Sequence, residues 1–133
     1  MELMSDVLVS GGAEGTVLRF DAPISFWGGI NAVTSKVVMA GHPQTGNYIK
    51  DKILVIPKLI GSSSSAAVIL ELIYAGLAPG GLILGEKDAI LPVGVLVARQ
   101  MNWQTIPVVA VADPPFQTGD QLYIHPDGRI DSV

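Results

Sequence analysis

The pattern of apolar and polar residues is clearest between Lys52 and Leu84, where it predicts a strand, a helix and a second strand. An apolar, β-branched run covers residues 53–56, and a second apolar run, 82–84, follows a Gly-Gly turn. Between them, a helical run from Ser64 to Ala75 contains Glu71 as its only charged residue, so almost every face of that helix must be covered. We therefore expect a βαβ unit with two parallel strands.

The loop before this helix consists of Gly61 followed by four serines, 62–65. Serine is a favoured N-cap residue, and Gly76 stands where helices commonly end in the left-handed conformation. Hydroxyl groups and unpaired backbone N–H groups therefore meet at one helix N-terminus, which attracts anions. Two interpretations are open: the serines only cap and solubilise the helix, or they bind a ligand. The loop matches neither the GxxxxGK[ST] phosphate loop nor the GxGxxG dinucleotide fingerprint.

The remaining apolar segments predict a mixed domain with more strands than helices. Strands are indicated at 7–9 with 16–20 as a hairpin, at 36–40, at 105–111, and at 120–124 with 129–133 as a terminal hairpin. Residues 89–98 are apolar throughout and predict a short buried helix. We expect one α/β domain over residues 1–133, a β/β/α fold with a partly closed, barrel-like sheet, the βαβ unit and one or two packed helices.

Two further loops contain candidate binding residues. In the stretch 25–29, Ser-Phe-Trp-Gly-Gly, two aromatic residues precede a glycine pair. The aromatics are typical of a plug that closes the end of a barrel, whereas Gly28 and Gly29 would let a backbone approach a ligand closely. Glu86 and Asp88 follow the second parallel strand, at the edge where α/β proteins gather ligands. These carboxylates either face the serine loop or form a solvated charge cluster.

The chain has two histidines, His42 and His125, and no cysteine. A loop histidine is more often a turn residue than a catalyst, and two histidines without cysteines make a poor metal site. Without cysteine the chain has neither disulfides nor thiolate-held metals. We therefore expect no metal site in this chain, interpret His125 as structural, and leave the roles of His42, Glu86 and Asp88 open.

Composition points to a protein partner. Of the 133 residues, 49% are hydrophobic and only 15% are charged, and the mean hydropathy is +0.47. A permanent partner accounts for this apolar excess better than a membrane, because the longest helical-looking stretch contains Glu71 and is broken by Pro79-Gly80-Gly81. No signal peptide opens the chain, so we expect a cytoplasmic protein. A net charge of −4 with scattered basic residues argues against nucleic acid.

Five short motifs occur along the chain in a characteristic order. They are Ser25-Phe-Trp-Gly-Gly29, His42-Pro43, Lys52-Ile-Leu-Val-Ile-Pro57, Gly61-Ser62 and Pro92-Val-Gly94. In order and spacing they resemble the small, swivelling subunit of the aconitase X group of dehydratases, over nearly the whole chain. The resemblance implies a swivelling β/β/α domain and a large subunit that holds an iron or iron–sulfur centre. It also implies that Ser62, at the start of the helix, is the catalytic acid/base.

The loop before Ser62 is similar to the bacterial branch of that family, which is associated with cis-3-hydroxy-L-proline dehydration. The archaeal branch, which acts on mevalonate 5-phosphate, typically has a charged or glycine residue followed by Gly-Ser-Thr, where this chain has Leu59-Ile60-Gly61 and serines. The missing cationic residue favours conversion of cis-3-hydroxy-L-proline to a pyrroline carboxylate, and mevalonate 5-phosphate is the alternative substrate. The expected substrate-binding residues are Gly61, Ser63, Ser64, Gly28 and Gly29.

A serine hydroxyl is a very weak base at neutral pH. A helix N-terminus stabilises an anion by about 0.3–2 kcal/mol, far less than an alkoxide requires. Ser62 would therefore act only across an interface, with a metal or cationic group supplied by the partner. Ser64 and Ser65 should already be helical, and Ser65→Ala should do little to turnover or folding.

Two other classes of protein stay open. One is a phosphohistidine-carrying swivel domain, which would need a histidine where the serines lie. The other is a non-catalytic module that binds an anion or metabolite at the same helix N-terminus. Such a module would bind a small anion unaided, whereas a dehydratase subunit should be inactive until its partner is added.

Overall fold

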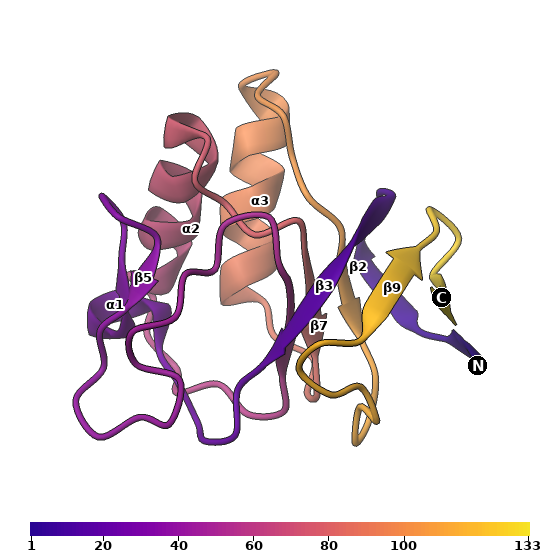
Figure 1. Ribbon diagram of the computed structural model, residues 1–133. Helices are drawn as coiled ribbons and strands as arrows, with labels where there is room; N and C mark the ends of the chain where they lie inside the picture. Colours follow the sequence, from indigo (N-terminus) through magenta and orange to yellow (C-terminus); the bar gives the residue numbers. More distant parts are fainter.

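The central unit of the computed structural model, which describes all of residues 1–133, has the predicted βαβ order. Strands β6 (Ile53–Ile56) and β7 (Gly81–Leu84) pair in parallel, and helix α2 (Ser65–Ala75) connects them. Gly76 ends α2 in the left-handed conformation, with φ of 74°. Helix α3 (Ile90–Gln100) then leads from β7 to the parallel strand β8 (Val108–Ala110). The two helices lie side by side against the sheet (Figure 1).

The remaining strands extend this parallel core on both sides. They are β1 (Glu2–Met4), β2 (Asp6–Val9), β3 (Ala13–Arg19), β9 (Gln121–Ile124) and β10 (Arg129–Ser132). The order in the sheet is β1-β10-β9-β3-β6-β7-β8-β2, in which β3 is parallel to β6 and the outer pairs are antiparallel. Four adjacent parallel strands therefore end at one edge of the sheet.

The sheet curls until its two outermost strands become neighbours. Strands β1 and β2 lie at opposite ends of the strand order, yet only Ser5 separates them along the chain. Both the N–H and the hydroxyl of Ser5 donate to the carbonyl of Gly128, at 3.1 and 2.6 Å. The predicted α/β class is confirmed, and the barrel-like sheet is not closed, because β1 and β2 do not pair with each other.

Alternate residues of each strand face two apolar cores. On β6, Leu54 and Ile56 face α2 and α3, whereas Ile53 and Val55 face the concave side of the sheet. All four side chains are buried, because the strand is covered on both faces. This arrangement explains the uninterrupted apolar run that the sequence shows at this strand.

Two strand predictions were wrong. Strands β2 and β3 do not form a hairpin, because β2 pairs with β8 while β3 pairs with β6 and β9. The strand expected over 36–40 is only β5 (Lys36–Val37), which pairs with β4 (Ile30–Asn31) in a separate two-stranded ribbon. The terminal hairpin is present as β9 and β10, and the helix expected over 89–98 is α3.

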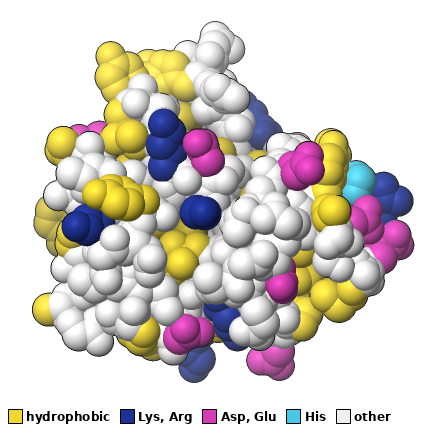
Figure 2. Space-filling view, in the orientation of Figure 1, with side chains coloured by type: hydrophobic (Ala, Val, Ile, Leu, Met, Phe, Trp, Pro, Cys, Tyr) yellow, Lys and Arg dark blue, Asp and Glu magenta, His cyan; other side chains and the backbone are white.

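The visible face of the molecule has no large area of one charge. Figure 2 shows acidic and basic side chains scattered over this face, with apolar side chains gathered at the upper ends of α2 and α3. The rings of Tyr74 and Trp103 contact each other there, tilted by 54° with centroids 4.9 Å apart. None of the helices has both the length and the apolar character that a membrane crossing requires.

Candidate functional site

The parallel strands β6 and β7 end at the same edge of the sheet and bring their two following loops together. Gly61 and Ser62, from the loop after β6, line a hollow of about 10 Å³ with Asp88, from the loop after β7. An adjoining hollow of about 80 Å³ shares Gly61 and Asp88 and includes Glu86. The structure therefore brings Asp88 to the serine loop, whereas Glu86 is exposed and lines only the second hollow.

The N-terminus of α2 has free hydrogen-bond donors. The backbone N–H groups of Ser63, Ser64 and Ala66 make no hydrogen bond within the chain, while the N–H of Ser65 donates to the carbonyl of Ser62 at 3.0 Å. Ser64 occupies the N-cap position but forms no side-chain cap, so the capping interpretation of the serines is not supported at this residue. The free N–H groups leave this helix end able to bind an anion.

The fourth serine of the loop, Ser65, also lines the smaller hollow, but its side chain is buried and hydrogen-bonded within the protein. It is 5% exposed, and its hydroxyl accepts a hydrogen bond from the N–H of Trp27 at 3.1 Å. The hydroxyl of Ser25, also buried, lies 3.4 Å from that of Ser65. Ser65 therefore anchors the 25–29 stretch to the first residue of α2, a link that the sequence analysis missed.

The 25–29 stretch is a turn rather than a helix. It is labelled α1 (Phe26–Gly29) in Figure 1, but Trp27 and Gly28 have non-helical angles, with φ of 78° at Gly28. The predicted aromatic plug is half right, because Phe26 is fully buried while Trp27 is 62% exposed. A Cβ on Gly29 would lie 3.1 Å from Cγ1 of Ile24, whereas Gly28 faces open space. A side chain at position 29 would therefore crowd Ile24, and the positive φ of Gly28 suits the turn.

Both histidines form local structural contacts, in separate parts of the molecule. His42 is buried, its Nδ1 accepts from the N–H of Gln44 at 3.0 Å, and its Nε2 lies 3.0 Å from the carbonyl of Ala22. Because Nδ1 accepts, Nε2 carries the proton and donates to Ala22. This neutral ring links the loop that contains His42 to Ala22, in the segment that follows β3.

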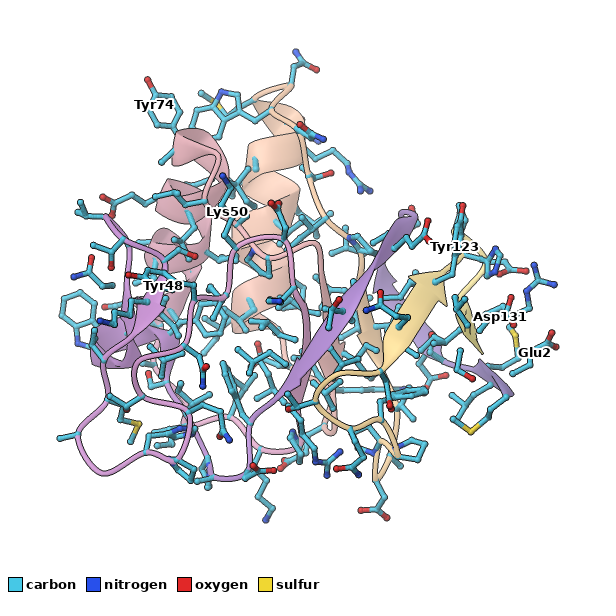
Figure 3. The ribbon with its side chains drawn as sticks, viewed as in Figure 1. Glu2, Tyr48, Lys50, Tyr74, Tyr123 and Asp131 are labelled. Atoms are coloured by element: carbon cyan, nitrogen blue, oxygen red, sulfur yellow. The ribbon has the colours of Figure 1, made fainter.

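The interpretation of His125 as structural agrees with its contacts. Its Nε2 lies 2.8 Å from a carboxylate oxygen of Asp131, and its ring packs on Tyr123 in the terminal hairpin (Figure 3). No group of three or more His, Cys, Asp and Glu side chains is placed to hold a metal ion. Neither histidine is available to the hollow beside Ser62.

Ser65→Ala should lower the free energy of unfolding by about 1–3 kcal/mol, because it leaves the part-buried N–H of Trp27 without its acceptor. This replaces the expectation from the sequence that the substitution would do little to folding. Ser64→Ala is the matched control, since Ser64 is exposed and caps nothing. Urea unfolding of the three proteins measures the difference, and equal stability of the two variants would contradict the anchoring role.

Comparison with known proteins identifies the family. Residues 2–132 match the family model described as the aconitase X swivel domain. This chain belongs to that family. The swivel domain is 39% identical over 109 residues to the cis-3-hydroxy-L-proline dehydratase of Hypocrea jecorina, covering 82% of this chain and 18% of that protein. It is 34% identical over 128 residues to the phosphomevalonate dehydratase small subunit of Thermococcus gammatolerans, covering 96% of this chain and 93% of that one.

A second cis-3-hydroxy-L-proline dehydratase, from Pseudomonas aeruginosa, is 33% identical over 129 residues, covering 93% of this chain and 22% of that protein. The swivel domain therefore spans about a fifth of the length of the two hydroxyproline dehydratases. It also matches the crystal structure of Thermococcus kodakaraensis aconitase X in its holo-form, with a TM-score of 0.90 and 31% identity, covering 100% of this chain and 98% of that one. The match supports the aconitase X interpretation over a phosphohistidine-carrying swivel domain.

Proposed function

We propose that this swivel domain is one component of a hydro-lyase that dehydrates a β-hydroxy acid, with Ser62 as the acid/base. The observation that carries the proposal is the placement of the Ser62 loop: it shares a hollow with Asp88 and precedes a helix end with free N–H donors. Family membership and the dehydratase names of the relatives support the same reaction class. Proton transfer by a positioned side chain typically contributes about 10²–10⁴-fold to rate.

The swivel domain provides only part of an active site. The hollows that contain Gly61 and Asp88 measure about 10 and 80 Å³, whereas small-molecule sites usually measure roughly 300–1,000 Å³. The residues around them do not fit an iron or iron–sulfur centre, because they offer no cluster of metal ligands. We assign that centre, and the cationic surroundings that Ser62 needs, to the large subunit or to the larger part of one polypeptide.

Charge favours cis-3-hydroxy-L-proline as the substrate. Asp88 is the only charged residue that lines the hollow of Ser62, and one of its carboxylate oxygens accepts from the N–H of Leu91 at 2.8 Å. A zwitterionic amino acid matches this arrangement, since its carboxylate fits the free N–H groups of α2 and its ammonium group fits Asp88. A phosphate in the hollow of Ser62 would be repelled by the same carboxylate, whereas the adjoining hollow is lined by Lys87 as well as Glu86 and Asp88. Mevalonate 5-phosphate is the alternative, supported by the Thermococcus relative.

The test is an assay of the swivel domain combined with its large partner, using both substrates. We expect turnover of cis-3-hydroxy-L-proline to a pyrroline carboxylate. Asp88→Asn should lower kcat/KM for this substrate by about 10–100-fold, because the variant loses a charge-assisted hydrogen bond but keeps an acceptor for the N–H of Leu91. Turnover of the phosphorylated acid alone would reverse the choice of substrate.

Glu71→Gln is the matched control, because Glu71 is an exposed carboxylate on α2 and lines neither hollow. It should leave kcat/KM unchanged, and an equal loss of kcat/KM in both variants would contradict the special role of Asp88.

The free N–H groups of α2 also suit a non-catalytic anion-binding module. Calorimetry with the swivel domain alone distinguishes the two: binding of a small anion without a partner, together with an inactive complex, would favour the module.

A further inference from the structure

Trp27 is a large apolar side chain that stands out of an otherwise buried segment. Ile24, Ser25 and Phe26 before it are buried, as is Gly29 after it, whereas Trp27 itself is 62% exposed. Scattered exposed apolar residues are common on protein surfaces and need no explanation. Trp27 differs from these residues in two ways: its backbone is fixed by hydrogen bonds, and it is linked through Ser65 to the serine loop.

The backbone of Trp27 is fixed from both sides. Its N–H donates to the buried hydroxyl of Ser65, and the preceding ring of Phe26 is fully buried. On the other side, the N–H of Ile30 donates to the carbonyl of Phe26 and closes the turn through Gly28. Because the backbone is already fixed, covering this tryptophan restricts only its two side-chain torsions, which favours tight binding.

The same contacts place Trp27 beside Ser62. Ser65 joins the two, because its hydroxyl accepts from the N–H of Trp27 while its own N–H donates to the carbonyl of Ser62. Ile60, 43% exposed, lies on the other side of Gly61, and its N–H donates to the carbonyl of Ile24. We call Trp27 and Ile60 the Trp27 rim: two exposed apolar residues that flank the start of the serine loop.

We infer that the larger part of the dehydratase docks on the Trp27 rim, with Trp27 as the central anchor. The inference rests on the proposed function, in which that larger part must cover Ser62. The occupant is suggested by the relatives: the swivel domain makes up 18% and 22% of two dehydratases, so about four-fifths of each lies outside the matched region. Trp27 and Ser62 are each one hydrogen bond away from Ser65, so a surface that covers Ser62 and extends past Ser65 would reach Trp27.

Two other groups of exposed apolar residues are not hydrogen-bonded to Ser65. Helix α3 presents a stripe of Val93, Leu96, Val97 and Met101, but nothing in the structure shows what covers it. Tyr74 is 72% exposed and points outward at the upper end of α2 (Figure 3). It is nine residues beyond Ser65, about 13 Å along the helix axis. Tyr74 is therefore an aromatic residue of similar exposure at the end of α2 remote from Ser62.

The experiment is a titration of the large dehydratase subunit from the same organism into the swivel domain, with Kd as the readout. Trp27→Ala should raise Kd by about 30-fold or more, the size expected when an aromatic anchor is removed. Tyr74→Ala, the matched control, should leave Kd within about 2-fold. Equal weakening of binding by both variants would overturn the inference. An unchanged Kd for Trp27→Ala would also overturn it, and if KM were raised at the same time, Trp27 would touch the substrate and not the partner.

A second measurement does not depend on removing Trp27. The chain contains two tryptophans, so Trp103→Phe leaves Trp27 as the only indole. Its fluorescence emission should shift to shorter wavelength when the complex forms, because the indole leaves water. A complex that forms without this shift would contradict docking at Trp27. A complex that never forms with the unchanged chain would instead refute the proposed function, so the two failures are distinguishable.

Discussion

Ser62→Ala should lower turnover of the assembled dehydratase by about 10²–10⁴-fold while leaving the stability of the swivel domain almost unchanged. The two effects separate because the hydroxyl of Ser62 makes no hydrogen bond within the chain, although the residue lines the hollow shared with Asp88. Its removal therefore breaks no structural contact. By contrast, the hydroxyl of Ser65, three residues later, holds the turn at Trp27.

Turnover of the assembled complex and urea unfolding of the swivel domain measure the two effects. Ser64→Ala is the control for any general effect of removing a hydroxyl from this loop, because Ser64 is exposed and forms no cap. Although Ser64 is an expected substrate-binding residue, the variant keeps its free backbone N–H, so it should retain near-normal turnover. If Ser63→Ala or Ser64→Ala lost activity while Ser62→Ala retained it, the assignment would be wrong by one or two residues. If all three retained activity, the serine loop would be structural only.

The parts of the fold that the sequence predicts are those with local signals. The βαβ unit follows from an apolar run, a serine-rich start and a glycine at the helix end, and each of these signals lies within a few residues of the element it defines. The same is true of the terminal hairpin, whose turn is Pro126-Asp127-Gly128 and whose glycine has φ of 95°. Signals within a few residues of each element were sufficient to predict both the βαβ unit and the terminal hairpin.

The failures come from pairing between distant segments. The pattern of β2 and β3 suits a hairpin, but their partners β8 and β6 lie far along the chain, and no local signal encodes that choice. In the site, the sequence analysis expected little from Ser65→Ala because it considered only the position of Ser65 in the helix. The acceptor role of Ser65 depends on Trp27, which is 38 residues away in sequence. The available signal was Ser25 beside two aromatic residues, a stretch that we interpreted as a plug or, through Gly28 and Gly29, as a ligand site.

Gly85→Ala should destabilise the swivel domain by more than about 3 kcal/mol, because the loops after β6 and β7 meet at this residue. A Cβ on Gly85 would overlap the carbonyl oxygen of Pro57 and would lie 2.7 Å from its Cα. Both are backbone atoms that cannot rotate away, and the N–H of Gly85 is itself bonded to the carbonyl of Ile56 at 2.8 Å. The strand ends would have to separate, at a cost at or beyond the usual range for overpacking.

Gly61→Ala is the matched control at the same edge of the sheet. A Cβ on Gly61 meets no atom within 4 Å, and its φ is not in the left-handed region, so the unfolding free energy should change by less than about 1 kcal/mol. Thermal unfolding of the two variants measures the contrast, and for a domain of this size Gly85→Ala should lower Tm by roughly 10 °C or more. A Gly85→Ala protein as stable as Gly61→Ala would show that the two loops are not in contact. Because the Pro57 loop continues directly into Gly61 and Ser62, close packing at Gly85 also fixes the distance between the serine loop and Asp88, on which the proposed site depends.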